Sequence, residues 1–132
     1  MGGGPYVLAS RDLMCNEIDV IMDGCQLDAM VLLATCDKNV PGVLMGAARL
    51  DLPTVIVTGG YMQSPCVDGK VIDGITIGNS CGEVDEGKLS LEAFEDQLDI
   101  ACPAPGACGF MGTANTMCVL TEAMGLSIPG NS

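Results

Sequence analysis

Two segments of this 132-residue chain carry the side chains best suited to chemistry. In the first, residues 35–42, the soft thiol of Cys36 stands beside the hard carboxylate of Asp37, a pairing that suits two unlike metals. Lys38 follows directly and would be out of place there as a free cation. The segment comes after an apolar run typical of a strand. Because ligands of open α/β sheets bind beyond the carboxyl ends of strands, we expect a site here.

The second segment, residues 101–117, is a Gly- and Pro-rich turn that leads into a predicted helix. Cys108 lies near the start of that helix, where the helix dipole would stabilise a thiolate. Cys102 lies in the same turn and is a rival to Cys108. Either thiol can equally be interpreted as a small buried apolar side chain, so both interpretations stay open at this point.

The composition excludes several classes of function. Five Lys and Arg against 17 Asp and Glu give a formal net charge of -12, which opposes binding to nucleic acid or to an anionic membrane. Because the chain has no His, it cannot supply a Ser-His-Asp triad, a Cys-His pair or an imidazole zinc ligand. Neither a transmembrane span nor a signal peptide is indicated, since the longest apolar stretch is residues 29–34. We therefore expect a cytoplasmic protein whose eight reduced cysteines serve metal or cluster chemistry, or fill the core.

Two other patterns carry little weight. Residues 82–88 match the first seven positions of a phosphate-binding loop, but Leu89 replaces the magnesium-binding hydroxyl and acidic side chains within the loop would repel phosphate. The chain has no Cys-x-x-Cys pair, so a structural zinc site is an alternative without a matching motif. Neither pattern changes the choice of the two cysteine segments.

The apolar spacing predicts an α/β fold. A helix is expected from Ser10 to about Gly24, and residues 28–34 form an unalternated apolar run, as in a strand covered on both faces. A second helix from Pro41 to about Leu50 and a second buried strand at residues 53–58 complete a β-α-β unit of usual length. We therefore expect a parallel sheet with helices on both faces, and a single domain over residues 1–132.

The remainder is predicted less sharply. Residues 59–88 have the composition of a loop or lid, with a short Asp-Gly hairpin at residues 71–77. Ser90 is expected to cap a helix whose Leu91, Phe94 and Leu98 face inward and whose acidic side chains face solvent. A final helix is expected to end at Gly125.

The two cysteine segments, taken with their surroundings, resemble the dihydroxy-acid dehydratase and phosphogluconate dehydratase family. The resemblance lies in Ser10-Arg11, the Gly59-Gly60 turn and residues 36–45, 47–54, 101–117 and 122–130, in the family's order. It covers nearly the whole chain and is weakest over residues 61–98. Two long motifs in the right order make the resemblance specific.

The resemblance implies an iron-sulfur hydro-lyase, which converts a 2,3-dihydroxy acid, or an aldonic acid with that grouping, into a 2-keto acid and water. By resemblance, Cys36 and Cys108 would bind a 2Fe-2S or 4Fe-4S cluster, and Asp37 with a carbamylated Lys38 would hold Mg²⁺. Carbamylation makes the lysine an anionic oxygen ligand and so removes its mismatch with a hard cation.

The resemblance also implies what these 132 residues do not contain. The family's base is a serine of a separate C-terminal domain, and its third cluster cysteine and a further magnesium-binding aspartate lie upstream. We therefore expect a fragment of the N-terminal cluster-binding domain, with no catalytic base in this chain and no turnover from it alone. The full-length enzyme is expected to be a homodimer.

The sequence leaves alternatives open for the substrate and for the role of this chain. The Ala-Cys-Pro-x-x-Gly-x-Cys form at residues 101–108 is similar to the dihydroxy-acid dehydratase branch, which serves branched-chain amino-acid biosynthesis. Residues 112–115 are also compatible with the sugar-acid branch, and Tyr61 departs from the expected proline after the Gly-Gly turn. The remaining alternative is a non-catalytic binding module of the same fold. The expected ligand is a small dihydroxy or sugar acid, with no nucleic-acid or membrane partner.

Overall fold

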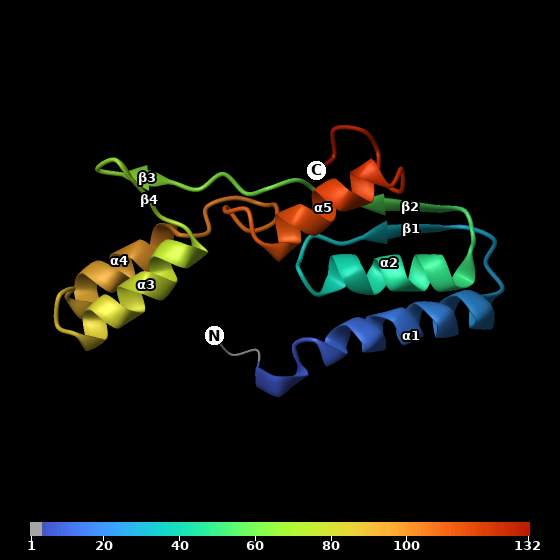
Figure 1. Ribbon diagram of the computed structural model, residues 1–132, viewed down its shortest axis with the longest axis horizontal. Helices are drawn as coiled ribbons and strands as arrows, with labels where there is room; N and C mark the ends of the chain where they lie inside the picture. Colours follow the sequence, from blue (N-terminus) through green and yellow to red (C-terminus); the bar gives the residue numbers. More distant parts are fainter. Residues whose placement is uncertain (1–3) are drawn as a thin grey trace.

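The computed structural model describes residues 4–132. A 3-10 helix, Gly4–Tyr6, precedes α1 (Ala9–Cys25), β1 (Met30–Leu33), α2 (Asn39–Leu50) and β2 (Thr54–Val57). A two-stranded hairpin of β3 (Cys66–Val67) and β4 (Lys70–Val71) follows, and then α3 (Gly74–Asp85), α4 (Leu91–Ile100) and α5 (Thr113–Ala123). Figure 1 shows α3 and α4 set to one side of the part built from α1, α2, β1 and β2.

The predicted β-α-β unit is confirmed. Strands β1 and β2 pair in parallel, from Met30 with Thr54 to Leu33 with Val57, and α2 connects them. Figure 1 shows α2 between the strand pair and α1. Close approach of the two helices depends on Gly46, where an added Cβ would lie 3.0 Å from the Cδ1 of Ile18 on α1. The α/β class thus arises from the elements that the apolar spacing predicts.

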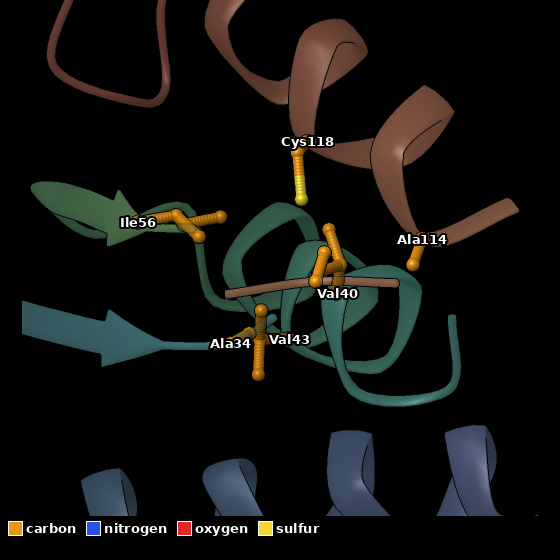
Figure 2. Close-up of a cluster of buried hydrophobic side chains, with 7 residues drawn as sticks. Ala34, Val40, Val43, Ile56, Ala114 and Cys118 are labelled. Atoms are coloured by element: carbon orange, nitrogen blue, oxygen red, sulfur yellow. The ribbon is translucent and has the colours of Figure 1, made fainter. Parts of the chain in front are cut away.

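The core joins α2, β2 and α5. Ile56 of β2 and Val40 of α2 are completely buried, and Cys118 of α5 is nearly so. Figure 2 shows the Cys118 side chain directed toward Val40, with Ile56 beside them. Burial raises the pKa of the Cys118 thiol, which therefore stays protonated and packs as an apolar group. Cys118 is therefore one of the cysteines that fill the core.

The expectation that helices cover both faces of the sheet is wrong within residues 4–132. Met30 and Leu32 pack against α1 and α2, whereas Val31 and Leu33 of the opposite face are 68% and 76% exposed. Val55 of β2 is also exposed on that side. The apolar run is suited to burial on both faces, but burial also requires a second packed layer, which the described residues do not supply.

The hairpin lies a few residues before its predicted place. It spans β3 and β4, and its turn is Asp68-Gly69, where both residues have positive φ angles, 50° and 79°. Asp73-Gly74 instead begins α3, because the Asp73 Oδ1 accepts hydrogen bonds from the backbone N–H groups of Ile75 and Thr76, each at 2.9 Å. Much of the predicted loop or lid is therefore hairpin and helix.

Two predicted helical faces also differ. In α4, Ser90 caps the helix through a 3.2 Å hydrogen bond from the Ala93 N–H, as expected, but Leu91 and Leu98 are exposed rather than inward. Its firm contact is with α3, where the Ser80 hydroxyl donates to Gln97 Oε1 at 2.6 Å. In α1, the apolar spacing predicts Ile21 and Met22 on one inward face, but Met22 is buried and Ile21 is half exposed. The periodicity of apolar residues shows which face of a helix is apolar, but it does not show how much of that face neighbouring elements cover.

Candidate metal and cofactor site

Both cysteine segments lie at the carboxyl ends of the parallel strands. Cys36 comes three residues after the end of β1. The second segment reaches the chain just after β2, because the Ala107 N–H donates to the Gly60 carbonyl and the Met62 N–H donates to the Ala107 carbonyl, both at 2.8 Å. Segments far apart in the sequence are thereby brought to one edge of the sheet.

One pocket of about 220 Å³ lies between the two segments. Its lining includes Cys36, Cys108 and also Cys102. All three of these cysteines are exposed and free. The structure thus places Cys36 and Cys108 on one pocket and adds Cys102, the thiol that the sequence left as a rival.

Asp37 and Lys38 form an ion pair outside the lining of that pocket. Lys38 Nζ donates to Asp37 Oδ2 at 2.5 Å, and the Cys36 thiol donates to Asp37 Oδ1 at 3.2 Å. Burial would raise the pKa of Asp37, but these two hydrogen bonds and the positive charges of Lys38 and Arg11 outweigh it and lower the pKa. Asp37 is therefore a carboxylate at neutral pH, next to a pocket lined by thiols.

Two further residues hold the first segment in place. The Asn39 Oδ1 accepts a 2.6 Å hydrogen bond from the Cys36 N–H, and Arg11 of α1 donates from Nη2 to the Asp37 carbonyl at 2.9 Å. Sequence reasoning gave neither a role in the site. The signal available for Asn39 was the tendency of asparagine to bond nearby backbone groups in turns.

The second segment is held from two sides. Asn115 of α5 donates from Nδ2 to the carbonyls of Cys108 and Phe110, each at 2.6 Å. On the other side, the Ser64 hydroxyl donates to the Gly109 carbonyl at 3.0 Å. An added Cβ at Gly109 would lie 1.9 Å from the Ser64 Oγ, so the close approach requires glycine.

The chemistry of the donor set fits both expected groups in part. Thiolates are the ligands of iron-sulfur clusters, and a carboxylate such as that of Asp37 suits Mg²⁺. Within residues 4–132, however, no group of three or more Cys, Asp or Glu side chains is arranged to hold a metal ion. The described residues therefore offer partial ligand sets.

A second pocket, of about 310 Å³, adjoins the Cys108 segment at Gly109 and Phe110. It shares Gly109 and Phe110 with the first pocket and is otherwise lined by Tyr61, Met111, Asn115, Val119 and Ser132. Neither pocket is lined by Lys or Arg from the part of the chain that the structure describes. These surfaces offer no charged partner for a phosphate.

No helix among the described residues is long and apolar enough to cross a membrane.

Comparison with known proteins gives one consistent family. A family profile described as the N-terminal region of dihydroxy-acid/6-phosphogluconate dehydratases matches residues 1–132. The dihydroxy-acid dehydratase of Methanothermobacter thermautotrophicus is 44% identical over 128 residues, which cover 97% of this chain and 23% of that protein. That of Caldanaerobacter subterraneus is 44% identical over 130 residues, covering 98% and 23%. That of Pyrococcus abyssi is 42% identical over 130 residues, covering 98% and 24%. The chain thus spans about a quarter of the length of these relatives.

Proposed function

Because this chain belongs to the dihydroxy-acid/6-phosphogluconate dehydratase family, we propose that it forms part of an iron-sulfur hydro-lyase that dehydrates a 2,3-dihydroxy acid to a 2-keto acid. One observation of the structure carries the proposal: Cys36 and Cys108 line the same pocket. Since the relatives are about four times longer, the reaction belongs to the whole protein, and these residues supply one α/β portion of its site.

The proposed substrate is the dihydroxy acid of branched-chain amino-acid biosynthesis. The relatives' names support this choice, as does the lack of Lys and Arg in the described lining of both pockets. A phosphorylated sugar acid would be expected to meet a cation or a set of backbone N–H groups around its phosphate. The chain's net charge of -12 also opposes a dianionic phosphate.

In this proposal the thiolates of Cys36 and Cys108 bind the cluster, and Asp37 binds Mg²⁺ together with a carbamylated Lys38. When bound, these metals supply Lewis acidity toward the leaving hydroxyl and the substrate carboxylate. Carbamylation would replace the ammonium of the Asp37-Lys38 pair with an anionic oxygen. Two anionic groups side by side then need a cation between them, which supports Mg²⁺ at this position.

The chain's own residues prepare the site before chemistry. Asn39 and Arg11 fix the backbone around Cys36 and Asp37, so this stretch of backbone would not have to be ordered when a metal binds. The Cys36 proton now lies in a hydrogen bond to Asp37 and must leave when the sulfur binds a metal. Removal of the substrate proton is not assigned to any residue of this chain.

The test is anaerobic reconstitution of the complete natural protein with iron and sulfide, followed by metal and sulfide assay and visible absorption. We expect both to bind to the wild type and to be lost from Cys36→Ser and from Cys108→Ser. Cys66→Ser is the matched control, because Cys66 is also exposed and free but lies on β3 and not on the 220 Å³ pocket.

Two outcomes would contradict the proposal. Wild-type amounts of iron and sulfide in either site variant would remove that cysteine from the ligand set. Stoichiometric zinc without sulfide in the wild type would indicate a structural zinc site instead.

A further inference from the structure

We propose that Asn115 is a positioning residue, which fixes the loop of Cys108 so that its thiol stands at the pocket before any metal binds. The proposal deepens the proposed function and rests on it for the identity of the bound group. The fixing of the loop itself rests on the structure alone.

The first support is the chemistry of the carboxamide. Asn115 is 7% exposed, and its Nδ2 donates to the carbonyls of both Cys108 and Phe110 at 2.6 Å. A carboxamide nitrogen carries two hydrogens, so one side chain can serve two acceptors. These two carbonyls flank Gly109, so Asn115 clamps the loop on both sides of it.

The second support is that the whole turn is tied to partners outside it. The Ala107 carbonyl accepts from the Met62 N–H at 2.8 Å, and the Gly109 carbonyl accepts from the Ser64 hydroxyl at 3.0 Å. Together with the two bonds from Asn115, four consecutive carbonyls, those of residues 107–110, have partners beyond the turn. The backbone is thus fixed while the Cys108 side chain remains exposed.

The third support is where Asn115 is anchored. It lies in the first turn of α5, between Ala114 and Cys118, which are both buried in the core. The helix therefore connects the loop rigidly to the packed centre of the molecule. Aspartate at this position would have nearly the same shape but would place a second acceptor against the two carbonyls.

The experiment compares Asn115→Asp with the wild type in the complete natural protein without metal. Hydrogen exchange is read at the amides of Ala107 and Gly112, which flank the turn and are both hydrogen-bonded. We expect exchange at these amides to become about ten- to a hundredfold faster, as for loss of a buried hydrogen bond, while the amides late in α5 keep their protection. Asn79→Asp is the matched control, because Asn79 is exposed on α3.

A second readout separates positioning from general support of the fold. After reconstitution with iron and sulfide, we expect Asn115→Asp to bind less of both, and its visible circular dichroism per bound iron to differ from that of the wild type. Asn79→Asp should match the wild type in both. Unchanged exchange in Asn115→Asp would overturn the proposal, and so would unchanged iron content and spectrum when the wild type binds a cluster.

Failure of the proposed function is distinguishable from failure of this inference. If the wild type binds no cluster but Asn115→Asp frees the turn, the iron-sulfur proposal fails and the loop assignment stands. If Asn115→Asp does not fold, Asn115→Ala replaces it, since it removes the donor to the Cys108 and Phe110 carbonyls without adding an acceptor. We expect about fivefold to tenfold faster exchange at Ala107 in that variant, and no change would overturn the proposal.

Discussion

Two asparagines hold the backbone of the two thiol-bearing loops, each in the opposite sense. Asn39 accepts from the N–H of Cys36, whereas Asn115 donates to the carbonyl of Cys108. The difference arises because the N–H of Cys36 faces Asn39, whereas the carbonyl of Cys108 faces Asn115. In both loops an asparagine side chain bonds the cysteine backbone and leaves the thiol exposed.

The carboxylate of Glu122 holds the last residues of the chain through hydrogen bonds that depend on pH. This carboxylate accepts from the Gly130 N–H at 2.7 Å and from the Ser132 N–H and hydroxyl, and these hydrogen bonds lower the pKa of Glu122. Because the folded pKa lies below the ordinary value of 4.5, the bonds contribute fully above that pH and are lost as pH falls through the folded pKa.

We therefore expect residues 128–132 to loosen in acid, visible as a shift of the Gly130 amide resonance toward that of a free chain. In Glu122→Gln the loosening should already be present at neutral pH, because the carboxylate is gone. Glu92→Gln is the control on an exposed face of α4. A Gly130 resonance that does not move with pH in the wild type would contradict this prediction.

At the scale of single residues the sequence named Cys36 and Cys108 as candidate ligands, and the structure adds the side chains that hold their loops. Loop position made Cys36 and Cys108 candidates, but only the family resemblance favoured Cys108 over its rival Cys102. Asn39, Ser64 and Asn115 could not be predicted, because hydroxyls and carboxamides serve turns, caps and solvent equally well. Their roles depend on a partner supplied by another part of the fold.

At the scale of elements, α3 depends on a single cap. Asp73 satisfies the N–H groups of Ile75 and Thr76 at the helix start. We expect Asp73→Ala to lower the free energy of unfolding by about 1 kcal/mol, as is usual for loss of a capping side chain. Denaturant unfolding measures the change, and Asp96→Ala on the exposed face of α4 serves as the control. Equal stabilities of the two variants would show that the cap is not needed.

The same cap explains the misplaced hairpin. The chain contains Asp-Gly at 68–69 and again at 73–74, and the dipeptide is suited to a tight hairpin turn as well as to a helix start. The following residues decide, since Thr76 can bond both Asp73 and the Val71 carbonyl while the turn at Asp68-Gly69 joins two short strands. The twelve-residue helix α2 was predicted correctly because more residues contribute to its pattern.

For the whole molecule, the parallel strand pair is buried on one face and exposed on the other. Ile56 lies on the covered face and Leu33 on the open one. We expect Ile56→Ala to lower the free energy of unfolding of the 132-residue chain by about 2 to 5 kcal/mol, because it leaves a cavity in the core. Leu33→Ala should change it by about 0.5 kcal/mol or less, since an exposed side chain loses few contacts.

Urea unfolding of both variants measures these free energies. The two m-values should be equal, so that a shift of the midpoint reports a change in stability. A large loss of stability in Leu33→Ala would mean that the open face is covered in solution. The sequence could predict the β-α-β topology, because strand and helix lengths are local properties. It could not predict which face is covered, because coverage depends on which other parts of the chain reach the sheet.

The pairing of Ala107 with Gly60 and Met62 also sets the order of events during biosynthesis. Cys36 leaves the ribosome long before Cys108, and until the later segment docks beside β2 the earlier thiol has no partner from it. A metal that met the nascent chain would find only isolated thiols, which bind weakly and exchange freely. Under the proposed function, the metal would therefore be loaded into a folded protein rather than a growing one.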